Sequence, residues 1–196
     1  MLRGAEIIVG LASPSHEAPR GEIEEFDIQS FEGLNVKKWA ECYIALMLRS
    51  SQAKIEFANM VDNPMLKTIL TIVANDHKKI ADVMKLVFGI EEVKSDVFSK
   101  ECQEALGKAV LDRIKKAISL ARKLLIESKS EEDVNKLCET LLEIHDIAKG
   151  ALEAIANIAN EPTSTILRHL ASTIRSSADL VNNLVRKALL KGAQHE

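Results

Sequence analysis

The chain has 196 residues, of which 46% are hydrophobic and 28% are charged, and its formal net charge is −3. This length and composition allow one domain with a substantial core and exclude a disordered protein. Aromatic residues make up only 4% of the chain, which is typical of a helical protein rather than a β-sheet protein, and the small net charge makes nucleic acid an unlikely partner.

Residues 1–34 are expected to form an extended or partly disordered N-terminal arm. The arm contains Pro14, Pro19 and a cluster of acidic residues. Its apolar run, residues 7–12, is too short for a signal peptide, and no stretch of the chain approaches the roughly 20 apolar residues of a membrane span. We therefore expect a cytoplasmic protein without membrane segments. The acidic residues are Glu17, Glu22, Glu24, Glu25, Asp27 and Glu32.

Residues 36–61 and 64–89 are predicted to form a hairpin of two long helices. In both segments apolar residues recur at steps of three and four, which places them on one face of a helix. Asn63 is placed to cap the second helix, with Pro64 in its first turn, and Gly89 is placed to end it.

Residues 97–127 are predicted to form one long crossover helix with an apolar stripe and a basic face. This face is either a solvated surface or a docking surface for acidic groups, and the chain's own acidic arm is the simplest partner for it. The basic residues are Lys108, Arg113, Lys115, Lys116, Arg122 and Lys123.

A second hairpin is predicted over residues 131–192, with Ser130 as the cap of its first helix. It repeats the layout of the first hairpin, so residues 35–196 are expected to form a single helical-bundle domain built from an internal repeat. Ala58-Asn59 corresponds to Ala156-Asn157, Pro64 to Pro162, Ile69-Leu70 to Ile166-Leu167, and Ala81-Asp82 to Ala178-Asp179.

The three cysteines, Cys42, Cys102 and Cys138, lie far apart in the sequence. Their odd number argues against a disulfide framework and for a reducing compartment. Each lies in a predicted helix, so we expect a small buried side chain rather than a reactive thiol.

Two short stretches resemble rubrerythrin-type members of the ferritin-like superfamily. The first runs from Ser50-Ser51-Gln52-Ala53 to Phe57, and the second contains Asn63-Pro64 and ends in Ala81-Asp82. The resemblance implies a ferritin-like four-helix bundle with a long crossover. It also implies a di-iron site with one Glu from the first helix of each hairpin and a Glu-x-x-His motif from each second helix.

The positions where this family carries its iron ligands hold other residues here. In the first hairpin they are Ser50, His77 and Ile80, and in the second they are Ala148, Ile174 and Ser177. A conventional ferroxidase or peroxidase is therefore not expected, because hard iron ions need carboxylate ligands.

His77 and His145 leave a metal hypothesis open. Both are predicted to lie on inner helix faces, where imidazole and nearby carboxylates could hold zinc or iron in an altered geometry. The alternative is a buried neutral histidine with a structural role. Asp76, Glu143 and Asp146 are close in sequence but are expected to point mostly outward, and His169 is expected at the edge of an apolar stripe.

Two functions follow from these observations. The first is a non-enzymatic bundle that binds or assembles with an unknown ligand and needs no cofactor, with a homodimer as its expected state. The second is a metal-binding protein or metal-dependent oxidase with a rebuilt site around His77 and His145. A nucleic-acid adaptor that uses the basic face is a weaker third hypothesis, because no aromatic residues are interleaved with the basic ones.

Overall fold

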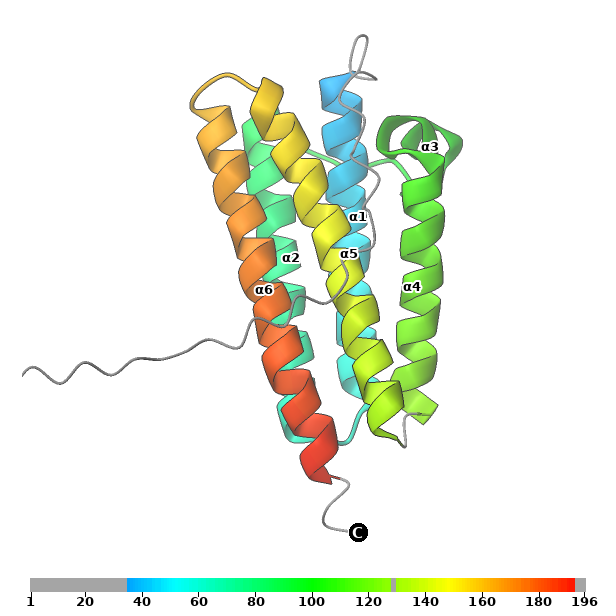
Figure 1. The fold of residues 1–196 in the computed structure, drawn as a ribbon. Helices are drawn as coiled ribbons and strands as arrows, with labels where there is room; N and C mark the ends of the chain where they lie inside the picture. Colours follow the sequence, from blue (N-terminus) through cyan, green and yellow to red (C-terminus); the bar gives the residue numbers. More distant parts are fainter. Residues whose placement is uncertain (1–34, 128–129, 193–196) are drawn as a thin grey trace, which may run out of the picture.

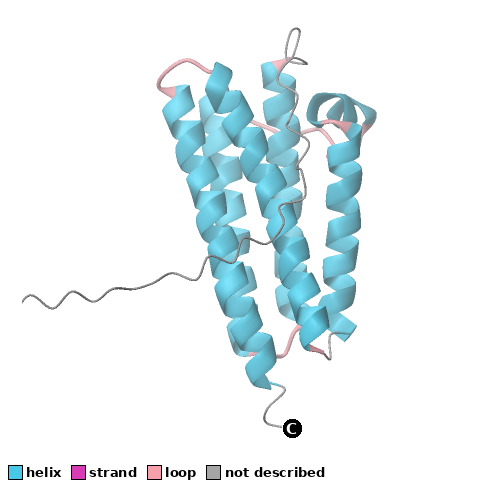
Figure 2. Cartoon of the chain, viewed as in Figure 1, coloured by secondary structure: helices cyan, strands magenta, loops and turns pink. Residues whose placement is uncertain are grey.

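The computed structural model describes residues 35–127 and 130–192, and every regular element in these ranges is an α-helix (Figure 1 and Figure 2). The prediction of an all-α protein is therefore confirmed. The N-terminal arm predicted over residues 1–34 lies outside the described residues. The helices are α1 (Val36–Met60), α2 (Pro64–Phe88), α3 (Lys100–Leu106), α4 (Lys108–Glu127), α5 (Glu131–Ile158) and α6 (Thr163–Gly192).

The long helices form two hairpins that pack side by side. α1 packs against α2, α5 packs against α6, and the hairpins meet where α2 contacts α6 (Figure 1). α4 runs along α5, and the short α3 lies against α1 at one end of the molecule. Helices of this length are not stable alone, so burial of their apolar faces on one another holds them in place.

Side-chain caps fix the helix ends where the sequence indicated them. Asn63 Oδ1 accepts a hydrogen bond from the backbone N–H of Leu66 at 3.1 Å, and Ser130 Oγ accepts one from Asp133 at 3.1 Å. Gly89 ends α2 in the left-handed conformation, with φ of 60°. These contacts satisfy backbone groups that have no partner inside a helix.

The core between the hairpins has an aromatic pair at one end. Trp39 and Tyr43 stack with ring centroids 5.1 Å apart, and both side chains are buried. The Tyr43 hydroxyl donates to the carbonyl oxygen of Ala148 at 2.9 Å, which ties α1 to α5 across the core. A buried tyrosine needs such a partner, since an unmade hydrogen bond in the core is unfavourable.

The prediction of a single helix over residues 97–127 is wrong. The segment forms two helices, α3 and α4, and Gly107 between them has φ of 87°. This backbone conformation is open to glycine and strained for other residues, so Gly107 ends α3 and lets the chain change direction. Ser99 starts α3 by accepting a hydrogen bond from the backbone N–H of Cys102 at 3.3 Å.

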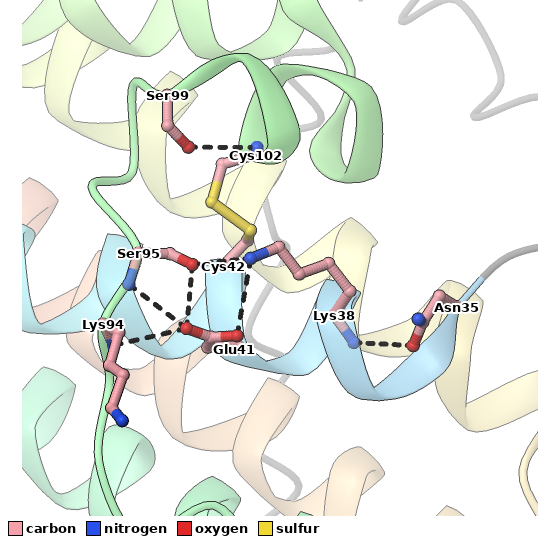
Figure 3. Close-up of polar contacts among 8 residues, drawn as sticks. All are labelled: Asn35, Lys38, Glu41, Cys42, Lys94, Ser95, Ser99 and Cys102. Atoms are coloured by element: carbon pink, nitrogen blue, oxygen red, sulfur yellow. Dashed lines mark hydrogen bonds and ion pairs between the residues drawn. A yellow bond between two sulfur atoms is a disulfide. The ribbon is translucent and has the colours of Figure 1, made fainter.

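The expectation that the cysteines form no disulfide is also wrong, although all three side chains are buried as predicted. Cys42 of α1 and Cys102 of α3 form a disulfide (Figure 3). Cys138 is buried and lies outside this bond. The break at Gly107 makes α3 a short separate helix that lies against α1 and places the two sulfur atoms together. The cysteine count is therefore no argument for a reducing compartment.

Next to the disulfide, a carboxylate fastens the link between α2 and α3 to α1. Glu41 Oε1 accepts hydrogen bonds from the backbone N–H groups of Lys94 and Ser95 and from the Ser95 hydroxyl, at 3.2, 3.1 and 2.8 Å (Figure 3). The Ser95 bond is the main cause that lowers the pKa of Glu41. The link is thus held both covalently and by hydrogen bonds.

Within the described ranges, every helix is too short or too polar to cross a lipid bilayer.

Candidate functional site

Five of the buried polar side chains on the long helices form a layer across the middle of the core. On each helix they lie between residues of two separate apolar clusters, one around Trp39 and Leu152 and the other around Phe57 and Leu137. A polar layer inside an otherwise apolar core is unfavourable unless its groups are partnered. The residues of this layer are Ser50 and Lys54 of α1, His77 of α2, His145 of α5 and Ser177 of α6.

The two histidines of this layer face each other across the bundle. The ring centroids of His77 and His145 are 5.4 Å apart, and the rings are nearly perpendicular, at 72°. Both side chains are almost completely buried, at 0% and 1% exposure. The structure thus brings together the two residues that the sequence singled out from separate hairpins.

The hydrogen bond of His145 fixes which of its nitrogens is available. His145 Nδ1 lies 2.6 Å from the carbonyl oxygen of Leu141, which can only accept. In the neutral ring Nδ1 therefore carries the proton and Nε2 carries the lone pair. His145 Nε2 and both ring nitrogens of His77 have no hydrogen-bond partner among the described residues.

Both histidines are neutral at physiological pH. Burial lowers the pKa of His145 to about 3, and the charge of Lys54 adds to this effect. Burial likewise holds the pKa of His77 well below its usual range, with smaller contributions from Lys54 and His145. Neutral imidazole is the form that binds metal ions.

Lys54 is the residue of the layer that the sequence did not reveal as important. Its side chain is 5% exposed, and its amine donates to Ser50 Oγ at 2.7 Å. The buried polar side chains among the described residues include no carboxylate that could pair with it. Burial lowers the pKa of Lys54 to about 7, so a neutral amine is accessible under ordinary conditions.

A signal for Lys54 was present in the spacing. Lys54 follows Met47 by seven residues and Ser50 by four, and both of these lie on the inner face of α1. The general expectation that lysine lies at the surface outweighed that spacing.

The six positions that the resemblance in sequence assigns to iron ligands all lie in the core of this protein. None of their side chains is a carboxylate, and the described residues contain no group of three His, Cys, Asp or Glu side chains arranged for a metal ion. The residues present therefore do not fit a di-iron site. The six are Ser50, His77, Ile80, Ala148, Ile174 and Ser177.

Of the carboxylates near the histidines in sequence, two are exposed and Asp76 is half-buried. Asp76 accepts a hydrogen bond from Ser177 Oγ at 2.9 Å and lies partly at the surface. Glu143 pairs with Arg113 of α4 at 3.4 Å on the outside of the bundle, and Asp146 is exposed. His169 is exposed as well.

The basic face predicted for the crossover lies on α4. Its residues are exposed, and a groove of about 460 Å³ runs between α4 and α5. Part of the positive charge is already engaged, since Arg113 pairs with Glu143 and the Lys115 amine lies 5.6 Å from the centre of the Phe98 ring. The groove therefore presents mixed charge rather than a continuous basic surface.

Comparisons of the chain with protein-family models, with curated proteins and with solved structures found no match.

Proposed function

We propose that this protein is a non-enzymatic, ferritin-like helical bundle that has lost the di-iron site and acts as an assembly protein, with a second copy of itself as the first partner. The observation that carries the proposal is a stripe of exposed apolar side chains along α2. The replaced ligand positions support the non-enzymatic part, because the family's oxidative chemistry depends on the iron that those positions would hold.

The α2 stripe consists of Met65, Ile72 and Leu86, which are 50%, 43% and 83% exposed. They are spaced by seven residues or by twice seven, and Lys79 occupies the intervening position. A spacing of seven keeps side chains on one line along a helix, which is the arrangement that pairs helices with one another. Single exposed apolar residues are common on protein surfaces, whereas an aligned row of them marks an interface.

The stripe is complementary to itself. When two α2 helices pack antiparallel about a two-fold axis near Asn75, Met65 of each copy meets Leu86 of the other. In the same register Ile72 packs against the alkyl stem of Lys79, whose amine stays in water. A stable dimer buries about 800 Å² on each partner. Ile55 and Met60 of α1, the helix that packs against α2, are exposed apolar residues as well.

Sedimentation equilibrium on the full chain, over roughly 1–100 µM, tests this proposal. We expect a species of twice the 21.6 kDa chain mass for the parent protein. The double variant Ile72→Lys/Leu86→Lys should be monomeric, because it buries two charges in the interface. Ile158→Lys is the matched control, since Ile158 is 47% exposed at the end of α5 and outside the stripe. A monomeric parent at the highest concentration, or a dimer that survives the double variant, would contradict the proposal.

A further inference from the structure

We propose that the core of the bundle holds one copper(I) ion between α2 and α5, bound by His77 and His145, with the side-chain amine of Lys54 of α1 as the third nitrogen ligand. This inference concerns the interior and goes beyond the self-association of the surface. It starts from the ring nitrogens of two buried histidines that come from different hairpins. Three of these four nitrogens have no partner in the described part of the protein.

A buried nitrogen without a partner is unfavourable, so a natural core rarely retains several of them without a reason. The Nε2 atom of His145 carries a lone pair, because the proton of that ring is on Nδ1, which donates a hydrogen bond to the carbonyl oxygen of Leu141. His77 in its neutral form offers a second lone pair. Two imidazole lone pairs in the same buried polar layer are suited to a metal ion.

The distance between the rings agrees with a shared ion. A metal–nitrogen bond of about 2.0 Å and a ring radius of about 1.2 Å place each ring centre about 3.2 Å from a bound ion. Two rings at a tetrahedral or trigonal angle are then about 5.2–5.5 Å apart, and two rings on opposite sides of the ion about 6.4 Å apart. The observed separation is 5.4 Å. Edge-to-face ring pairs have similar spacings, so the argument for a metal rests on the unpartnered nitrogens and the distance supports it.

The bent arrangement of the two rings leaves room for a third ligand, and Lys54 is the nearby candidate. Its side chain is buried in the same polar layer as the two rings, and its amine donates a hydrogen bond to Ser50 Oγ of that layer at 2.7 Å. The charge of Lys54 contributes to the lowered pKa of both histidines, which agrees with this placement, and burial lowers the pKa of Lys54 itself to about 7. A neutral amine has one lone pair and can bind a metal ion as imidazole does.

The charge of the site selects the metal. All three ligands are neutral, and the buried polar side chains described around them include no carboxylate. A divalent ion would place two uncompensated charges in an apolar core, whereas copper(I) places one. Imidazole suits copper as well as zinc, and copper(I) accepts three-coordinate geometry, whereas magnesium, calcium and manganese prefer oxygen ligands.

The test is an anaerobic titration of the full chain with copper(I) in ascorbate, with bicinchoninate as the competing chromophoric chelator. We expect one copper(I) per chain. His77→Leu and His145→Leu should each weaken binding more than about 100-fold, and Lys54→Leu about tenfold, in keeping with the loss of a ligand. His169→Gln is the matched control, because His169 is an exposed histidine. The copper(I) affinity of this variant should equal that of the parent protein. Circular dichroism verifies that each variant is folded.

X-ray absorption at the copper edge gives a second readout that requires no variant. Two imidazoles and one additional nitrogen in a three-coordinate site are expected for the loaded parent protein. The proposal is overturned if the parent takes up no copper(I), if uptake survives both histidine substitutions in folded protein, or if the spectrum shows linear two-coordinate copper. Equal affinity in Lys54→Leu would overturn the assignment of Lys54 as a ligand.

Discussion

The amine of Lys54 donates a hydrogen bond to the hydroxyl of Ser50 one helical turn earlier, at 2.7 Å, inside the bundle. This is a weak partner for a buried cation, because a hydroxyl neutralises no charge. Burial of the charged form is unfavourable, and the fall in the pKa of Lys54 to about 7 is the result. The native state therefore contains a group that makes it less stable at neutral pH than an apolar residue would.

Lys54→Met should stabilise the protein, and the gain should depend on pH. The unfolded chain keeps this lysine protonated up to about pH 10.5, whereas the folded chain releases the proton from about pH 7 upward. Between these values the unfolded state binds more protons, so the stability of the parent rises with pH. The gain from Lys54→Met is therefore largest at or below pH 7 and shrinks toward pH 9.5.

Urea unfolding of parent and variant at pH 6, 7, 8 and 9 measures this difference. Lys100→Met is the control, since the Lys100 side chain is 89% exposed, and it should leave the free energy of unfolding unchanged. A gain in stability that is constant from pH 6 to 9 would show that burial does not shift the Lys54 proton equilibrium.

The lowered pKa values of His77 and His145 predict that the protein loses stability in mild acid. Unfolded histidine titrates near pH 6.5, and His145 in the folded protein titrates near 3. Within this window the unfolded state binds more protons, so stability falls as the pH is lowered, by up to roughly 1 kcal/mol per pH unit for each histidine. The same direction holds for His77.

His77→Leu and His145→Leu should each flatten the decline in stability from pH 6.5 to 5. Chemical denaturation at half-unit pH intervals gives the slope, with His169→Gln as the exposed-histidine control. Slopes that match the parent in both core variants would mean that the two histidines are protonated as easily in the folded as in the unfolded state.

Much of the helical architecture was accessible from local sequence patterns. The apolar residues at steps of three and four, the caps at Asn63 and Ser130, and the terminating Gly89 predicted helices that the structure shows within a few residues. These signals are local, since each depends on atoms within about one helical turn. The break at Gly107 was missed because a single glycine inside a helical pattern is often tolerated.

The candidate site was predicted only in part, because its geometry depends on contacts between distant segments. The inner faces of α2 and α5 placed His77 and His145 in the core, but no local pattern fixes the 5.4 Å between their rings. The disulfide joins cysteines separated by 60 residues, and its formation depends on how α3 folds back on α1. Lys54 was missed because a lysine without a buried acidic partner is rare in a core.

Loss of the Cys42–Cys102 disulfide should lower stability substantially. The bond closes a loop with a sequence separation of 60 residues, and a cross-link of this span stabilises a protein by roughly 2–4 kcal/mol through the unfolded state. In a chain of this size that corresponds to a fall in Tm of very roughly 5–15 °C. Calorimetry with and without a thiol reductant measures the difference.

The double variant Cys42→Ala/Cys102→Ala is the control for reduction. Its Tm should be low and independent of the reductant, whereas the Tm of the parent should fall when reductant is added. Mass spectrometry of the unreduced protein identifies the bond directly. A parent whose Tm does not respond to complete reduction would contradict a stabilising role for the disulfide.

Glu41 should control the local opening of the link between α2 and α3. Its carboxylate accepts the backbone N–H groups of Lys94 and Ser95, and this arrangement favours the charged form. Because the pKa of Glu41 is lowered from 4.5, its contribution is present above that pH and is lost as the pH falls through the folded-state value. In Glu41→Ala both amides lose their acceptor, so their hydrogen exchange should speed up by about tenfold, as expected for the loss of roughly 1.4 kcal/mol.

Glu56→Ala is the control, because Glu56 forms an exposed ion pair with Arg49 at 3.7 Å, and exchange at Lys94 and Ser95 should be unaffected by it. Unchanged exchange in Glu41→Ala would mean that the hydrogen bonds to Glu41 do not hold the link to α1.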